Sequence, residues 1–252
     1  MRRTAFTMGT AVVIDIPGLK DDKIIELAFQ QLRQIDERFS PYKKTSELYR
    51  FNQGLIAAGR VSSDMKAVMK ACLDAEIHTN GYFSAKYSGI FDPSGYVKGW
   101  AVDRVRRSIL DQGLNTFCIS AGGDIVASSN GEKTWRIGIL NPLKKTEAIG
   151  NISTTSLSLA TSGNYERGNH IVNPVTGSAP GDFVSVSIAG PDIIEADVLA
   201  TAVFAMGKNG LDFIDKQEGY EVLAIDSRGR FYSSAEMETM LEQGLTITGK
   251  VV

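Results

Sequence analysis

The sequence predicts a mixed α+β fold, in which largely antiparallel sheets pack against helices and residues 1–252 form a single domain. Segments with a helical spacing of apolar residues occur together with short apolar runs typical of strands, but the two kinds do not alternate regularly. That order disfavours a doubly wound parallel sheet. No low-complexity linker and no internal repeat divides the chain, which favours one domain.

The composition is that of a globular protein without a general affinity for polyanions. Hydrophobic residues make up 43% and charged residues 22%, and 27 Lys and Arg against 29 Asp and Glu give a formal net charge of -2. This balance disfavours nucleic acid as a partner. Glycine is in excess, with 25 in 252 residues against a usual share of about 7%, and we expect the surplus at particular turns.

Nothing in the sequence indicates export or a membrane span. Two arginines follow Met1, but no apolar stretch or small-residue cleavage site comes after them, and no run of about 18 apolar residues occurs. We therefore expect a cytoplasmic protein without a signal peptide, a lipoprotein anchor or a membrane partner. Cys72 and Cys118 are far apart and lack metal-site spacing, which favours inert buried thiols over a disulfide or a zinc site.

The first half of the chain predicts one strand and three helices. The strand covers residues 4–16, contains a glycine and ends at Pro17-Gly18. The first helix ends before Pro41, and its apolar face consists of Ile25, Ala28, Leu32, Ile35 and Phe39. The second helix begins at Ser63-Asp64 and ends at Asn80-Gly81. The third runs from just after Gly99 to about residue 111.

Strands dominate the second half. We expect them at residues 116–120, 135–140, 148–155 and 184–189. A helix over residues 196–206 stops at Gly207, and a short helix follows at 211–216. Residues 220–225 and 230–233 predict a hairpin joined by the turn at 226–229.

Candidate site residues gather in segments that are rich in glycine, small hydroxyl residues and charge. These segments are residues 8–10, 92–99, 120–124, 160–167 and 170–177. In the second of them, glycines allow backbone N–H groups to approach a phosphate, Lys98 supplies positive charge, and a helix begins just beyond. The segment is not a Walker A loop. The alternative interpretation is an exposed lysine beside a helix cap.

Asp197 and Thr201 stand four residues apart, so they lie on one side of the predicted helix. Two stacked oxygen donors suit Mg²⁺, which leaves other positions for water and substrate phosphates. Alternatively, Asp197 caps the helix and Thr201 bonds back to the carbonyl four residues earlier.

The two histidines differ in context. His78 lies at the end of a predicted helix and receives no role, whereas His170 lies in a loop and is the natural general base if a hydroxyl must lose its proton. The GxSxG, GxGxxG and HExxH motifs are absent, which disfavours serine-nucleophile, Rossmann and zincin chemistry.

Each of these motifs is weak alone, but their order along the chain resembles the ApbE family of FAD:protein FMN transferases, once described as thiamine biosynthesis lipoproteins. The resemblance covers residues 4–226. It rests on Met8-Gly9-Thr10, Ser40-Pro41-Tyr42, Ser46-Glu47-Leu48 with Phe51-Asn52, residues 92–99, Gly122-Gly123-Asp124, Thr161-Ser162-Gly163 with Tyr165-Glu166-Arg167, His170 with Pro174 and Thr176-Gly177, and Ala196-Asp197 with Leu199 and Thr201 to Gly207.

The resemblance implies a T-fold-like α+β domain and an enzyme that takes FAD as substrate. With Mg²⁺, or Mn²⁺ as the alternative, the enzyme splits the pyrophosphate and transfers FMN to a Thr or Ser hydroxyl of an acceptor flavoprotein, releasing AMP. Asp197, Thr201 and a backbone carbonyl near Gly95 are implied as metal ligands, Lys98 as the cation beside the pyrophosphate, and His170 as the base. The other residues implied to bind the flavin nucleotide are Met8, Tyr42, Asp92, Gly122, Gly123, Asp124, Ser162 and Thr176.

The chain departs from the family pattern at residues 81–84. Family members usually carry Gly-x-Phe-Asp-Pro followed by a long insert, whereas here Ser84 replaces the Asp and Asp92 follows within a few residues. Residues 82–84 therefore receive no role. Two other functions stay open, namely an FAD pyrophosphatase that yields FMN and AMP with water as acceptor, and a non-catalytic FAD-binding or delivery protein.

Overall fold

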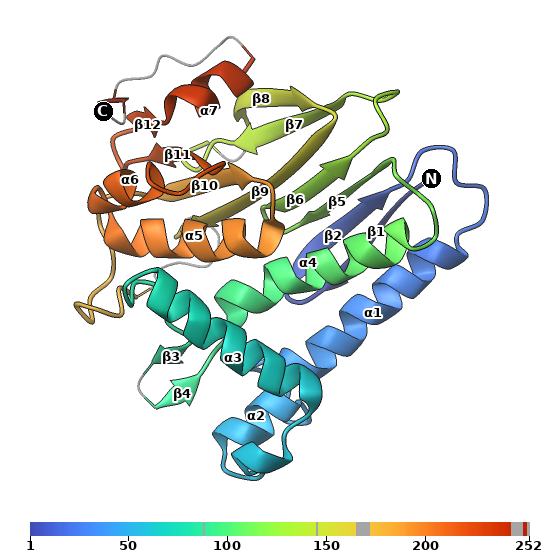
Figure 1. Cartoon of the computed structure of the whole chain (residues 1–252), viewed down its shortest axis with the longest axis vertical. Helices are drawn as coiled ribbons and strands as arrows, with labels where there is room; N and C mark the ends of the chain where they lie inside the picture. Colours follow the sequence, from blue (N-terminus) through green and yellow to red (C-terminus); the bar gives the residue numbers. More distant parts are fainter. Residues whose placement is uncertain (88, 145, 165–171, 243–248, 251–252) are drawn as a thin grey trace.

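Figure 1 shows a computed structural model of the chain, which describes residues 1–87, 89–144, 146–164, 172–242 and 249–250. The strands are β1 (Arg2–Thr7), β2 (Thr10–Asp15), β3 (Lys86–Tyr87), β4 (Ile90–Phe91), β5 (Phe117–Ala121), β6 (Asp124–Ser128), β7 (Trp135–Leu140), β8 (Ala148–Thr154), β9 (Ser156–Gly163), β10 (Ser185–Gly190), β11 (Glu221–Ile225), β12 (Phe231–Ser233) and β13 (Gly249–Lys250). The helices are α1 (Lys23–Phe39), α2 (Glu47–Asn52), the 3₁₀ turn η1 (Ala58–Arg60), α3 (Ser63–His78), α4 (Ser94–Leu110), α5 (Ile193–Met206), α6 (Asn209–Ile214) and α7 (Ala235–Met240).

Within the described residues, the central element is a nine-stranded sheet with the spatial order β1-β2-β5-β6-β9-β10-β11-β12-β13. Its neighbouring pairs are antiparallel except for β12 with β13, which is parallel. Separate two-stranded sheets are formed by β3 with β4 and by β7 with β8. The mixed, largely antiparallel α+β class is therefore confirmed. We propose that residues 1–252 form one domain, because strands from both ends of the chain share the central sheet.

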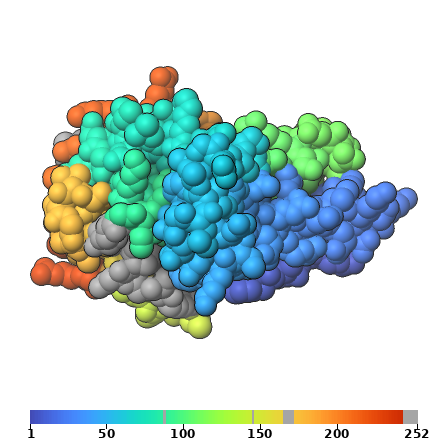
Figure 2. Space-filling view, turned by 90° about the horizontal axis from the view of Figure 1, so that it is seen from below, coloured from blue at the N-terminus to red at the C-terminus, as the bar shows by residue number. Residues whose placement is uncertain are grey.

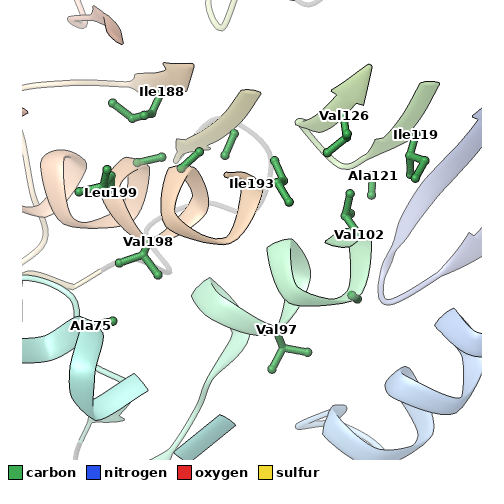
Figure 3. Close-up of a cluster of buried hydrophobic side chains, with 14 of the residues drawn as sticks. Ala75, Val97, Val102, Ile119, Ala121, Val126, Ile188, Ile193, Val198 and Leu199 are labelled. Carbon is green, nitrogen blue, oxygen red and sulfur yellow. The ribbon is translucent and has the colours of Figure 1, made fainter. Parts of the chain in front are cut away.

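Helices α4 and α5 lie side by side beneath one face of the sheet, with α1 next to α4 (Figure 1). The side chains of Val102, Ile119 and Val126 meet between α4 and the sheet, while Ile188 and Leu199 meet between the sheet and α5 (Figure 3). The hairpin β7–β8 and α7 cover the opposite face through a second buried cluster that includes Trp135, Ile152 and Met237. The outer helices α1, α2 and α3 cover much of the face seen in Figure 2.

The N-terminal strand prediction was wrong in one respect. Residues 4–16 do not form one strand, because the chain reverses at Met8 and Gly9, whose φ values are 54° and 71°. Positive φ at both central residues of a two-residue loop matches the twist of a hairpin. Strands β1 and β2 therefore pair antiparallel, with Thr7 opposite Thr10.

The predicted helices are present, but three of their starts differ, and the short helix α6 spans Asn209–Ile214 rather than 211–216. Helix α1 buries the predicted apolar face, and α3 is capped by Ser62, whose Oγ accepts from the Met65 N–H at 3.2 Å. Helix α4 begins at Ser94 rather than after Gly99, so Lys98 lies inside the helix. Helix α5 also begins earlier than predicted, at Ile193, and Asp192 caps it. The sequence interpretation missed the helical elements α2, η1 and α7 and the strands β3, β4, β6, β9 and β13.

Both cysteines are free thiols, as predicted. Cys72 is buried and Cys118 is half-buried. Burial is the main cause that raises the pKa of Cys72 to about 12 and of Cys118 to about 11, so both are protonated and unreactive near neutral pH. Among the described residues, the longest apolar stretch of any helix falls short of what crossing a membrane requires.

Replacing Asp226 by Ala is expected to destabilise the fold by about 1–2 kcal/mol. The Asp226 carboxylate holds the β11–β12 turn together by accepting from the N–H groups of Arg228 and Arg230, each at 2.9 Å, and from Arg230 Nε at 2.7 Å. The Arg230 side chain is 44% exposed, so water screens the ion pair and the backbone bonds contribute most.

The effect of Asp226 depends on pH. Burial alone would raise the pKa of Asp226, but the hydrogen bonds from Arg230 and Arg228 outweigh it and lower the pKa. Because the pKa in the folded state is below the unfolded value of about 3.9, the stabilisation is present above that value and is lost as the pH falls through the folded pKa. Urea unfolding should separate Asp226→Ala from wild type at pH 7 and not at strongly acidic pH, whereas exposed Asp212→Asn should match wild type throughout.

Candidate active site

A cavity of about 680 Å³ opens between α1, the short hairpin β3–β4, the start of α4 and the end of β9. Its volume lies within the range of small-molecule sites. The residues that line it are Met8, Gly9, Ile35, Asp36, Phe39, Ser40, Pro41, Tyr42, Tyr82, Ser84, Ala85, Lys86, Ile90, Asp92, Ser94, Gly95, Val97, Lys98, Gly122, Thr161, Ser162, Gly163, Val172, Pro174, Asp197 and Thr201.

Asp92 lies at the entry to α4 because the residue before it, Phe91, is held through both its backbone N–H and its backbone carbonyl. The Asn52 side-chain amide donates to the Phe91 carbonyl at 2.8 Å and accepts from the Phe91 N–H at 3.0 Å. Asp92 Oδ1 in turn accepts from the Ser94 N–H at 3.0 Å. A carboxylate at the N-terminus of a helix is favoured by the helix dipole, so Asp92 is held at the mouth of the cavity.

Lys98 projects from the second turn of α4 toward two buried carboxylates. Its Nζ lies 2.6 Å from Asp124 Oδ1 and 3.5 Å from Asp197 Oδ1. The Asp124 and Asp197 side chains are 0% and 2% exposed, so both are almost fully buried. The Lys98 side chain is 21% exposed and lines the cavity. The exposed-lysine alternative is therefore excluded.

Asp124 enters this cluster through a tight turn between β5 and β6. The two turn residues, Gly122 and Gly123, have φ values of 56° and 97°, which L side chains rarely adopt. An added Cβ at Gly122 would also lie 2.7 Å from Thr10 Oγ1. The turn therefore requires glycine at this point, and it directs Asp124 into the protein rather than into solvent.

The buried cluster contains two carboxylates and one ammonium, which leaves one negative charge uncompensated. Burial opposes the charged ammonium of Lys98, but Asp124 and Asp197 outweigh it and raise the pKa of Lys98. Burial also raises the pKa of Asp124 and of Asp197, and Lys98 offsets this only in part. With both carboxylates ionised, the cluster carries one excess negative charge, and their raised pKa values mean that it favours the uptake of a proton or of a metal cation.

Asp197 and Thr201 are brought to the cavity by α5. Asp197 Oδ2 accepts from the Gly99 N–H at 2.9 Å, and Thr201 Oγ1 lies 3.1 Å from Ser162 Oγ. Gly95 is close by, since a Cβ added to it would lie 3.3 Å from Thr201 Oγ1. Because Asp192 accepts from the N–H groups of Ile194 and Glu195 as the helix cap, Asp197 does not cap α5.

The donor set around Asp197 fits a hard cation that brings some of its own ligands. No group of three or more His, Cys, Asp or Glu side chains suited to a metal occurs among the described residues. One carboxylate, one hydroxyl and a backbone carbonyl are nevertheless the oxygen donors that Mg²⁺ uses when water and substrate phosphates complete its shell. Together with the excess negative charge, these residues fit the predicted Mg²⁺.

Gly99 is the residue that permits α4 and α5 to cross closely enough for these contacts. A Cβ at this position would lie 2.9 Å from the Ile193 carbonyl oxygen and 3.0 Å from Asp197 Cβ. Contacts this short force backbone to move. The hydrogen bond between Gly99 and Asp197 therefore depends on the absence of a side chain.

Replacing Gly99 by Ala is expected to lower stability by about 1–3 kcal/mol through overpacking. The sign of this change in stability distinguishes overpacking from helix propensity, because Ala is otherwise favoured over Gly inside a helix by about 1 kcal/mol. Thermal unfolding followed by circular dichroism measures the change. Gly59→Ala is the matched control, since its added methyl meets nothing within 4 Å, and an unchanged or higher Tm for Gly99→Ala would contradict the close-crossing explanation.

The structure brings most of the sequence-predicted site residues to one cavity. Those that line it are Met8, Tyr42, Asp92, Gly95, Lys98, Gly122, Ser162, Asp197 and Thr201. Asp124 is buried behind Lys98, and Gly123 adjoins it in the turn. Thr176 is exposed in a turn where its Oγ1 lies 2.8 Å from Ser178 Oγ, and it does not line the cavity. His170 lies outside the described residues.

Several lining residues were not foreseen. They are Ile35, Asp36 and Phe39 at the end of α1, and Tyr82, Ser84, Lys86 and Ile90 around the β3–β4 hairpin. Ile35 and Phe39 carry no motif, because they belong to the apolar stripe that packs the core and that also reaches the cavity. The short spacing between Gly81 and Asp92 was the available signal for the hairpin.

The protein has an α+β fold and a cavity with two kinds of polar group. One kind is a set of oxygen donors that suit a hard cation, and the other is a lysine ammonium that suits a phosphate. The chain matches the sequence model of the ApbE family over residues 8–91 and 86–224, and it belongs to that family. Relatives named FAD:protein FMN transferase include that of Escherichia coli K12, which is 24% identical over 88% of this chain and 83% of its own. That of Vibrio cholerae is 25% identical over 94% of this chain and 91% of its own.

The shared length varies among the relatives. The Rhodobacter capsulatus protein of the same name is 31% identical over 60% of this chain, but the match spans only 31% of that relative. Among solved structures, the ApbE protein of Thermotoga maritima superposes with a TM-score of 0.85 at 23% identity, covering 96% of this chain and 99% of that one. The Vibrio cholerae flavin transferase ApbE gives 0.79 at 24% identity over 96% and 99%. These likenesses establish the shared fold.

Proposed function

We propose that this chain is a Mg²⁺-dependent FAD:protein FMN transferase, with FAD as its substrate and a flavoprotein as its acceptor. Membership of the ApbE family and the names of the relatives support this activity. The observation that carries the proposal is the meeting of Asp197, Thr201 and Lys98 at one cavity wall, which suits a pyrophosphate and its cation.

Each residue at the cavity would have a binding role that follows from its charge and position. Lys98 would face the pyrophosphate, and Asp197, Thr201 and the Gly95 carbonyl would hold Mg²⁺, whose chemistry when bound is to neutralise charge on the phosphate oxygens. Met8, Tyr42 and Asp92 at the mouth would contact the flavin nucleotide. Gly122, Gly123 and Ser162 would line or support the floor, and Thr176 would act from the adjoining turn.

The proposed reaction is a phosphoryl substitution. The acceptor Thr or Ser oxygen bonds to the phosphorus on the riboflavin side, the bridging P–O bond to the adenylate breaks, and AMP leaves with that oxygen. His170 would take the hydroxyl proton. Positioning and charge neutralisation supply most of the acceleration. The cytoplasmic location predicted from the sequence stays a prediction, and an acceptor in the same compartment would accompany it.

The test is a flavinylation assay with the full chain. It contains FAD, MgCl₂ and a candidate acceptor flavoprotein, and a second reaction contains that flavoprotein with its target Thr or Ser replaced by Ala. We expect a fluorescent acceptor band under denaturing conditions and an equal amount of AMP. The target-site variant should remain dark. Absence of covalent flavin on any such acceptor would contradict the proposal.

The same assay separates the other two functions. An FAD pyrophosphatase would release FMN and AMP at one rate with or without acceptor, and no protein band would fluoresce. A binding or delivery protein would retain FAD intact in the presence of Mg²⁺.

A further inference from the structure

The three buried charges of the site are arranged unevenly. The Lys98 ammonium lies 2.6 Å from Asp124 Oδ1, which is the distance of a strong charge-assisted hydrogen bond. It lies 3.5 Å from Asp197 Oδ1, where such a bond is weak. Asp124 therefore holds Lys98 more firmly than Asp197 does.

Asp124 has no direct access to a ligand in the cavity. It is 0% exposed, and it is not among the residues that line the cavity. Its Oδ2 is buried and has no hydrogen-bond partner among the described residues. A carboxylate in this setting is costly to bury, so Asp124 acts on the site through the charged groups beside it, and its short contact is with the Lys98 ammonium.

The two oxygens of Asp197 are used differently. Oδ2 is engaged by the Gly99 N–H at 2.9 Å, and the position of that bond is fixed by the close crossing of α4 and α5. Oδ1 faces the Lys98 ammonium at the longer distance of 3.5 Å. If Asp124 carried no charge, the nearest anion for that ammonium would be Asp197, and Lys98 would compete with a metal for the same oxygen.

We infer that Asp124 is a positioning residue, which draws the Lys98 ammonium away from Asp197 Oδ1 and so keeps that oxygen available to a divalent cation. This inference rests on the proposed function for the presence of a metal at Asp197. It assigns Asp124 a task other than the contact with flavin nucleotide that the family resemblance implies. It also explains why an acidic residue is buried beside a site that must attract a polyanion.

The test measures metal affinity rather than catalysis. Mn²⁺ is titrated into the full chain without FAD, and the free ion is followed by electron paramagnetic resonance. Asp124→Asn keeps the shape and removes the charge, so Lys98 should move to Asp197 and the Mn²⁺ Kd should rise by about tenfold or more. Adding Lys98→Met in the Asp124→Asn background removes the competitor and restores the wild-type net charge of the cluster, so the Kd should return to within about threefold of wild type.

Asp103→Asn is the matched control. Like Asp124, Asp103 is a buried aspartate and is 2% exposed, but it lies on α4 and its partners are Arg106 and Arg107. Its Mn²⁺ Kd should equal that of wild type, and circular dichroism confirms that each variant is folded. A purely structural role for Asp124 would lower stability without the recovery in the double variant.

Three results would overturn the inference. They are an Asp124→Asn protein that binds Mn²⁺ like wild type, a double variant that stays as weak as Asp124→Asn, and a wild-type protein that binds no Mn²⁺ at millimolar concentration. The flavinylation assay fails or succeeds independently. A protein that shows the expected Mn²⁺ pattern but transfers no flavin would contradict the proposed function and leave the positioning role of Asp124 intact.

Discussion

Replacing Asp197 by Asn is expected to slow flavin transfer by about a hundredfold or more, because a metal site that lowers a barrier by several kcal/mol would lose its only charged protein ligand. The fold should survive. The Asn carbonyl can still accept from the Gly99 N–H, and the buried cluster with Lys98 and Asp124 would change from one excess negative charge to none. We therefore expect an unchanged or higher Tm together with the loss of activity.

The comparison that checks this is a set of initial rates of acceptor flavinylation at saturating FAD across a range of Mg²⁺ concentrations. Asp103→Asn serves as the control, since it removes a buried carboxylate of α4 that faces away from the cavity. Its rate per folded molecule should match wild type. An Asp197→Asn enzyme within tenfold of wild type at every Mg²⁺ concentration would remove Asp197 from the metal site.

Replacing His170 by Ala is expected to lower the transfer rate by about a hundred- to ten-thousand-fold, the usual contribution of a general base. Gly163 and Val172, which precede and follow it in the chain, both line the cavity. A neutral imidazole accepts the hydroxyl proton and an imidazolium does not. The wild-type rate should therefore rise with pH as the imidazole loses its proton, and that rise should be absent in the variant.

The chain supplies its own control in its only other histidine. His78 ends α3, its Nε2 lies 3.0 Å from Gln217 Oε1, and it does not line the cavity. His78→Ala should retain the full rate and the wild-type pH profile. A second readout is the KM for FAD, measured from FAD cleavage without acceptor. Loss of a base alone should leave this KM unchanged, whereas a positioning defect would alter it as well as the rate. Equal rates for His170→Ala and wild type would show that the hydroxyl reacts without this base.

Much of the fold could be predicted because apolar periodicity is a local property. The strand at Trp135–Leu140 alternates buried and exposed positions, and the 226–229 turn carries its own signals, so both were predicted correctly. The start of α4 could not be predicted, because Gly95 and Gly99 both weaken a helix by propensity. Packing against α5 outweighs that preference, and Gly99 is present because of it.

The candidate site shows a similar limit. Order along the chain is enough to nominate Asp92, Lys98, Asp197 and Thr201, and the structure brings these residues to one cavity. Sequence does not distinguish a carboxylate that faces a ligand from one buried behind a lysine, because the residue type is the same and only the tertiary contacts differ. Asp124 belongs to the second kind, and only the sheet register that places it opposite Ala121 reveals this.

The position of β9 between β6 and β10 has a consequence for how the protein is made. Lys98 and Asp124 leave the ribosome well before Thr161, Ser162 and Asp197, which complete the same site. A nascent chain that ends before α5 would lack one of the two carboxylates around Lys98 and most of the oxygen donors. A site built from all of these residues therefore forms only after α5 has been synthesised.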